Sequence, residues 1–172
     1  MGGWTCLAYA LREPANVKAL VMACTSGALD PGALESFGRA QFDAWTKNAN
    51  EHNAALEARG VLAAGGERLA REQPALATLY RQIYQLTPDE FRVAVRARIR
   101  AQRVQPPSLL AALPVPVLFL NGEEDSVFPS PAGPGLAKLA PKGRHVSVPR
   151  AGHSVYFERA AEFNRIVEEF IA

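Results

Sequence analysis

The 172-residue sequence lacks most features of membrane, secreted and nucleic-acid-binding proteins. It has only two cysteines, Cys6 and Cys24, which lie in or beside apolar segments without metal-site spacing, so we expect reduced, partly buried thiols of a cytoplasmic protein. No apolar run approaches the roughly 18 residues of a membrane span, and no basic segment of a signal peptide opens the chain. Nineteen basic residues nearly balance 17 acidic ones, which argues against nucleic acid or a membrane surface as a partner.

The apolar content, 48%, is enough to build the core of one ordinary domain, and the sequence divides into three blocks. Residues 1–27 predict a helix that stops at Pro14, followed by a short buried strand over 17–22. Residues 28–107 contain no convincing strand and are typical of four or five helices, which we interpret as a cap or lid. Residues 108–172 predict strands over 115–121 and 144–148 and a strongly amphipathic final helix. This alternation predicts an α/β fold with about three parallel strands and an inserted helical cap.

Three local signals predict where cap helices begin. Asp30 followed by Pro31 is typical of an N-cap residue with proline at the first helical position. Pro74 is expected to open a second helix. Thr87 and Glu90 have the spacing of a capping box, in which each side chain satisfies a backbone N–H of the other residue.

An acid and a histidine follow two predicted strands of the third block. Asp125 comes four residues after the first of these strands, beyond a turn at Gly122, and His153 comes five residues after the second. Because loops at the carboxyl ends of neighbouring parallel strands share one rim, we expect the two side chains to meet there. A carboxylate that accepts a hydrogen bond from one imidazole nitrogen leaves the other nitrogen to act as a general base. Glu123 and Glu124 remain competitors for the acid role.

The first residues read like the second half of a G-x-S-x-G nucleophile elbow, the strained turn that presents a catalytic nucleophile. Met1 falls on the residue after the nucleophile, and Gly2 falls on the closing glycine, where a Cβ is expected to clash. The chain order is then nucleophile, acid and histidine, with the nucleophile itself missing.

Three segments together carry a resemblance to a known family: M-G-G-W-T-C-L-A-Y-A-L-R-E-P, L-P-V-P-V-L-F-L-N-G-E-E-D and A-G-H-S-V-Y-F-E-R-A-A-E-F-N. The chain resembles the C-terminal half to two-thirds of an α/β-hydrolase-fold protein with a helical cap. The resemblance implies that Asp125 is the triad acid, that His153 is the triad base, and that the backbone N–H of Met1 is an oxyanion-hole donor. The Met-Gly-Gly context suggests a serine nucleophile, and an aspartate, as in dehalogenase-like relatives, is the alternative.

The implied reaction is hydrolysis of a small ester, or of a related C–C or amide substrate, without a metal or organic cofactor. The small-molecule substrate is the only partner that the resemblance implies. We expect this chain to be inactive alone, as a truncated product or the result of a misplaced start. The alternatives are a non-catalytic binding protein that uses the cap, or one half of a split enzyme.

Residues within the chain are poor replacements for the nucleophile. Cys6 sits inside the first helix, where we expect it to contact packing partners, and Ser26 lacks an elbow although it could line the pocket. Ser154, next to the histidine, is expected to serve as a hydrogen-bonding residue of its loop. His52 and His145 have no neighbours at metal-ligand spacing and are expected to be structural or exposed.

Two groups of cap residues are candidates for the substrate pocket. Arginines at helical spacing, Arg96 among them, form either a solvated helix face or a grip for a substrate carboxylate (Arg92, Arg96, Arg100 and Arg103). Trp45, with Phe42 and Tyr84, either fills the cap core or lines an apolar cavity. We take Ser26, Trp45 and Arg96 as the pocket candidates.

Overall fold

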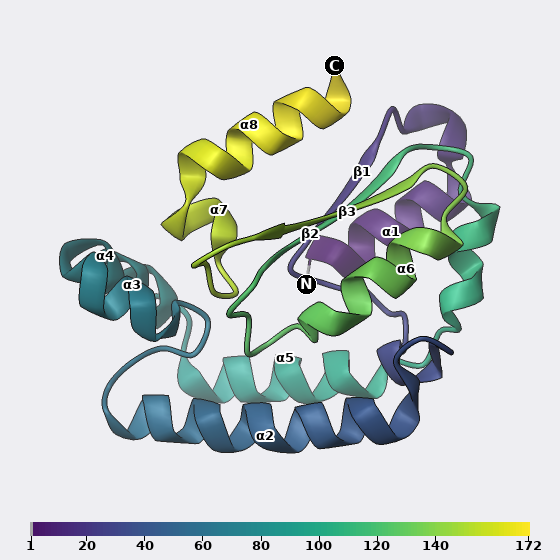
Figure 1. Cartoon of the computed structure of the whole chain (residues 1–172). Helices are drawn as coiled ribbons and strands as arrows, with labels where there is room; N and C mark the ends of the chain where they lie inside the picture. The colour runs from purple at the N-terminus through teal and green to yellow at the C-terminus, as the bar shows by residue number, and fades with distance from the viewer. Residues whose placement is uncertain (1) are drawn as a thin grey trace.

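A computed structural model describes residues 2–172 and shows an α/β fold built on a three-stranded parallel sheet (Figure 1). The strands are β1 (Leu20–Ala23), β2 (Val117–Gly122) and β3 (Gly143–Val148), in the order β1-β2-β3. Leu20 is in register with Val117, which in turn is in register with Gly143. The predicted parallel α/β architecture is therefore confirmed, although β1 begins three residues later than the sequence suggested.

Helices cover both faces of the sheet. One face carries α1 (Gly2–Arg12) and α6 (Gly133–Leu139), and the opposite face carries α7 (Val155–Glu158) and α8 (Ala160–Ile171) (Figure 1). Because side chains alternate along a strand, Phe119 of β2 packs into the first layer whereas Leu118 and Leu120 pack into the second. The apolar residues of α8 are not all covered by the sheet, since Ile166 is buried but Ile171 is exposed.

The helices between β1 and β2 are α2 (Gly38–Ala58), α3 (Gly66–Glu72), α4 (Pro74–Gln85) and α5 (Asp89–Ala101). Short 3₁₀ turns occupy the connections (Pro14–Asn16, Pro31–Ala33, Pro107–Ala112 and Ser130–Ala132). No helix among residues 2–172 combines the length and apolar character needed to cross a membrane.

Two of the three predicted helix starts behave as expected. Pro74 opens α4, and Asp30 caps a helical turn by accepting the N–H of Gly32 at 3.0 Å, although that turn is only a 3₁₀ segment. The predicted capping box is wrong. The N-cap of α5 is Pro88, one residue later than expected, so the Thr87 hydroxyl lies outside the helix and makes no cap hydrogen bond.

The start of α1 packs tightly against the turn that follows β1. A Cβ at Gly3 would lie 2.5 Å from Cγ2 of Thr25, whereas a Cβ at Gly2 would meet no atom within 4 Å. The expectation that Gly2 is the glycine without room is therefore wrong in the described residues. The close approach occurs one residue later, because α1 faces the turn through Gly3.

Candidate active site

Asp125 and His153 form a hydrogen-bonded pair at the rim of the sheet. Nδ1 of His153 lies 3.0 Å from Oδ2 and 3.1 Å from Oδ1 of the Asp125 carboxylate, and the aspartate side chain is fully buried. The carboxylate is itself held in place, because Oδ1 accepts the backbone N–H groups of Val127 at 2.8 Å and Phe128 at 2.9 Å. A fixed carboxylate on Nδ1 keeps the proton there and leaves Nε2 able to accept one.

Gly122 allows the two loops to come this close. A Cβ at this position would lie 2.1 Å from the carbonyl oxygen of Gly152 and 2.2 Å from that of Ala151, so only glycine fits. The backbone N–H of Glu124 donates to the Ala151 carbonyl at 2.9 Å and links the loops directly. The acid loop and the histidine loop are therefore packed backbone against backbone.

The structure distinguishes Asp125 from its two acidic neighbours. Glu123 and Glu124 are both exposed. The guanidinium of Arg68 donates through Nε to both carboxylate oxygens of Glu124, at 3.0 and 2.9 Å, and this hydrogen bonding lowers the pKa of Glu124. Within the acid loop, Asp125 is the carboxylate that faces His153.

Cys24 lies behind this pair at the end of β1, with a left-handed backbone (φ 52°). Its Sγ and the ligand atoms of Asp125 and His153 all lie within 4.8 Å of one another. Burial, followed by the nearby charge of Asp125, raises the pKa of the thiol, so it stays protonated near neutral pH. A protonated thiol is a poor metal ligand, and the other two side chains already satisfy each other, so the arrangement fits a packed thiol better than a metal centre.

Helices α2 and α4 are tied to the two loops by hydrogen bonds. Nδ2 of Asn53 on α2 donates to the Ser126 carbonyl at 2.8 Å, and the Ser126 hydroxyl lies 2.6 Å from Oδ1 of Asn53. The hydroxyl groups of Tyr80 on α4 and Ser154, next to the histidine, lie 2.7 Å apart. Burial raises the pKa of Tyr80 to about 12. Ser154 thus holds its loop by a hydrogen bond, as the sequence suggested.

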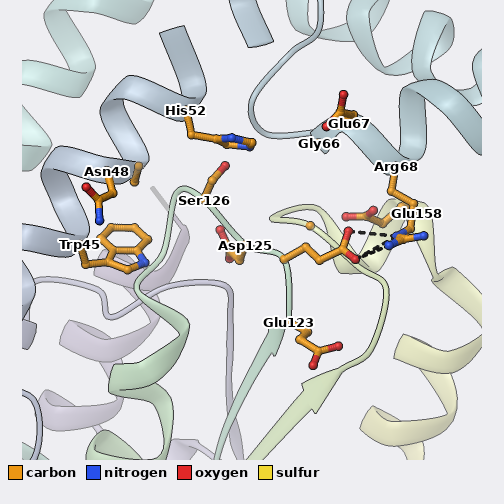
Figure 2. Close-up of a pocket in the computed structure, with 13 residues that line it drawn as sticks. Trp45, Asn48, His52, Gly66, Glu67, Arg68, Glu123, Asp125, Ser126 and Glu158 are labelled. Atoms are coloured by element: carbon orange, nitrogen blue, oxygen red, sulfur yellow. Dashed lines mark hydrogen bonds and ion pairs between the residues drawn. The ribbon is translucent and has the colours of Figure 1, made fainter. Parts of the chain in front are cut away.

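A cavity of about 460 Å³ lies between α2, α3 and the two loops (Figure 2). Asp125 and Trp45 line it, so the structure places this tryptophan at a pocket wall. Ser26 and Arg96 do not line this cavity. The Ser26 side chain is buried in its own turn, where the hydroxyl donates to the Leu29 carbonyl at 3.1 Å. The exposed Arg96 on α5 donates a hydrogen bond to the Tyr84 hydroxyl on α4.

The remaining cysteine and the two other histidines differ in how far they are exposed to solvent. Cys6 is exposed, contrary to expectation, because α1 turns Leu7 and Ala10 rather than Cys6 toward the sheet. His52 is exposed at the cavity mouth, whereas Nε2 of the half-buried His145 lies 2.7 Å from Oδ1 of Asn121.

Two of the aromatic candidates, Phe42 and Tyr84, lie away from the cavity. Phe42 packs against Phe37 and the core cluster, and Tyr84 stacks against the guanidinium of Arg92. Neither ring lines the cavity. Met1, the predicted oxyanion-hole residue, lies outside the described residues.

Sequence reasoning missed Glu158, which lines the cavity on α7 and is 5% exposed. Burial raises the pKa of its carboxyl group, and the N–H groups of Gly152 and Ser154 partly oppose that increase. Its Oε1 atom has no hydrogen-bond partner. The sequence carries no signal for this burial, because a glutamate at the end of a short helix is usually solvated.

The comparisons with known proteins concern nearly the whole chain. The chain matches 99% of its length to an esterase from Thermogutta terrifontis, with 22% identity and a TM-score of 0.68. It matches an enol-lactonase from Burkholderia xenovorans LB400 with 21% identity and a TM-score of 0.67. An esterase from Rhodococcus sp. ECU1013 matches 98% of the chain, with 25% identity and a TM-score of 0.63.

The chain covers 61% of the Thermogutta protein and of the Rhodococcus protein, and 62% of the Burkholderia protein. No protein of curated function shows significant sequence similarity to it. The family model described as the alpha/beta hydrolase fold matches residues 1–160. The chain therefore belongs to the α/β-hydrolase-fold family.

Proposed function

We propose that this chain supplies the acid and the base of a hydrolase triad whose nucleophile lies on a segment that these 172 residues do not include. The observation that carries the proposal is the pair itself, with Nδ1 of His153 at 3.0 Å from an Asp125 carboxylate that two backbone N–H groups hold in place. This arrangement fixes the imidazole tautomer and stabilises the imidazolium that forms when Nε2 takes a proton.

In the proposed reaction, Nε2 of His153 removes the proton from a nucleophile hydroxyl as that oxygen attacks the carbonyl carbon of the substrate. The imidazolium then donates the proton to the leaving alcohol, and the acyl group remains on the nucleophile. Water, deprotonated in the same way by His153, then attacks the acyl carbon; the bond to the nucleophile breaks, the imidazolium returns its proton to the nucleophile oxygen, and the acid product leaves. Backbone N–H groups, among them that of Met1, would stabilise the oxyanion. An aspartate nucleophile remains the alternative to serine.

Small esters and lactones are the proposed substrates. Two of the similar solved structures are esterases and one is an enol-lactonase. All of these substrates present a carbonyl carbon whose attack generates an oxyanion, which is the chemistry that a triad accelerates.

The serines closest to the pair in sequence are occupied, which supports inactivity of this chain alone. The Ser126 hydroxyl is paired with Asn53 of α2, and the Ser154 hydroxyl is paired with Tyr80 of α4. Ser26 is 1% exposed and is bonded within its own turn. We therefore expect 1–172 to hydrolyse esters no faster than buffer.

The test compares 1–172 with a longer protein read from the same frame upstream of Met1. The longer protein should hydrolyse p-nitrophenyl butyrate, and 1–172 should not. In the longer protein, His153→Ala and Asp125→Asn should each reduce kcat by a factor of about 10⁴, whereas Glu168→Gln, at an exposed position of α8 outside the cavity, should change it little. Ester hydrolysis that survives His153→Ala, or a stop codon directly upstream with no second chain that co-purifies, would contradict the proposal.

A further inference from the structure

Cys24 is a buried residue beside the acid and the base, and the proposed reaction does not use its thiol. The residue directly follows β1, is 4% exposed and has a left-handed backbone, with a φ of 52°. That region is unfavourable for a residue with a Cβ and is usually occupied by glycine, asparagine or aspartate. A cysteine in this conformation makes the contacts of its thiol worth following, because unusual backbone geometry gathers at functional sites.

The thiol lies where the end of β1 meets the acid loop and the start of α7. Its Sγ atom is within 4.8 Å of the ligand atoms of Asp125 and His153. Burial first, then the charge of Asp125 and a hydrogen bond with its side chain, raise the pKa of the thiol. The backbone N–H groups of Gly122 and Val155 lower that pKa by hydrogen bonding to the sulfur. Polar groups of three chain segments therefore surround this one side chain.

The types of these groups decide which of them receives the thiol proton. The two N–H groups approach the lone pairs of the sulfur, whereas a carboxylate can only accept. Oδ1 of Asp125 already accepts the N–H groups of Val127 and Phe128. Among the hydrogen bonds that the structure describes, Oδ2 has Nδ1 of His153 as its partner, at 3.0 Å. Since a carboxylate oxygen has two lone pairs, Oδ2 keeps room for one more donor.

The thiol also contributes to the core, so its two roles have to be separated. Cys24 belongs to the apolar cluster that includes Leu118, Leu120 and Val148. A role in packing alone depends on the volume of the side chain, whereas a role as a donor depends on its proton. Serine keeps a donor at this position and alanine does not, so the two substitutions distinguish the roles.

We propose that the thiol of Cys24 donates a hydrogen bond to Oδ2 of Asp125 and is a positioning residue for the triad acid. The inference rests on the proposed function, because the orientation of Asp125 matters to the reaction only if His153 is the base. The backbone of the acid loop holds Oδ1, and the thiol holds Oδ2 from the neighbouring strand. Because the thiol is neutral, it orients the carboxylate without cancelling the charge that stabilises the imidazolium.

Infrared spectroscopy of 1–172 tests the hydrogen bond directly, because the S–H stretching band lies where other protein groups do not absorb. Cys6→Ser removes the exposed thiol and leaves that of Cys24, and Cys24→Ser does the reverse. We expect the Cys24 band at a lower wavenumber than the Cys6 band, because a carboxylate is a stronger acceptor than water. Asp125→Asn should move the Cys24 band to a higher wavenumber. Coincident bands, or a Cys24 band that a folded Asp125→Asn chain leaves in place, would overturn the inference.

The Nδ1–H proton signal of His153 reports the same carboxylate from its other side. Cys24→Ala removes a donor that competes for Oδ2, so the Nδ1–H hydrogen bond should strengthen and its proton should shift downfield. Cys24→Ser should stay close to the wild type, and Cys6→Ala, at an exposed position of α1, is the matched control. Glu158, whose charge interacts with that of Asp125, is the same in every variant. Equal shifts in Cys24→Ala and Cys24→Ser would mean that the thiol only fills space.

Kinetics of the longer protein connect the hydrogen bond to the reaction. Cys24→Ala should lower kcat about fivefold with KM unchanged, and Cys24→Ser should restore most of the loss. An equal loss of kcat in both variants would contradict the role as a donor. The two spectroscopic measurements need no nucleophile, so their failure overturns this inference alone. A longer protein that hydrolyses no ester while the two spectra behave as expected overturns the proposed function alone.

Discussion

Gly122→Ala tests whether the contact between the acid loop and the histidine loop is as tight as the structure indicates. The new methyl carbon would lie 2.1 Å from the carbonyl oxygen of Gly152 and 2.2 Å from that of Ala151. Ordinary van der Waals contact begins near 3.4 Å, so the two carbonyl groups would have to retreat by more than 1 Å. Both belong to the backbone, so no flexible side chain can absorb the shift.

The cost should fall at the upper end of what overpacking causes, about 3 kcal/mol. For a chain of this size, that loss corresponds to a decrease in Tm of roughly 6–12 °C. The displacement should also separate Asp125 from His153, since Nδ1 and the carboxylate are joined across the same contact at 3.0 Å. Loss of stability and loss of the pair are therefore expected together.

Urea unfolding followed by circular dichroism measures the first effect, and the imidazole ¹⁵N signals of His153 measure the second. Gly2→Ala is the matched control, because a Cβ at Gly2 would meet no atom within 4 Å, and it should be neutral or slightly stabilising in the helix. If Gly122→Ala unfolds at the wild-type urea concentration and keeps the wild-type imidazole signals, the loops are not packed as described.

Two further predictions concern titratable groups elsewhere in the chain. The exposed Cys6 should react with a thiol reagent at once, whereas Cys24 should react only as the chain unfolds, because burial shields its thiol and raises its pKa. Rapid reaction of both thiols in the folded protein would contradict this prediction. Arg68, chiefly through its hydrogen bond, lowers the pKa of Glu72 from 4.5 to about 2, so this carboxylate stabilises the fold above pH 4.5 and that stabilisation is lost as the pH falls toward 2. In Glu72→Gln, the urea concentration at the unfolding midpoint should fall less steeply as the pH is lowered. An unchanged pH dependence would show that the ion pairs of Glu72 contribute nothing to stability.

The sheet could be predicted from the sequence because its strands are short, buried and strongly apolar. Residues 117–122 are buried throughout, and such a run is typical of a parallel strand covered on both faces. The positions of Asp125 and His153 followed from strand ends alone, since parallel strands bring their carboxyl-terminal loops to one rim. Periodicity and topology were enough for these features.

Features that depend on side-chain packing could not be predicted in this way. The shift of the α5 N-cap to Pro88 moved Thr87 out of reach, although the capping pattern itself was intact. Helical spacing could not show that Arg96 on α5 hydrogen-bonds Tyr84 on α4 instead of reaching the cavity. Glu158 was missed for the opposite reason, because nothing in its neighbours marks a carboxylate that tertiary contacts bury.

The hydrogen bonds from α2 and α4 give the pair of Asp125 and His153 a second set of supports. Asn53 on α2 anchors the loop of Asp125 through Ser126, and Tyr80 on α4 anchors the loop of His153 through Ser154. Two different helices thus each hold one half of the pair. A shift of α2 against α4 would therefore be transmitted to the distance between Asp125 and His153. Substitutions on α2 or α4 can therefore alter the geometry of the pair without contacting either of its residues.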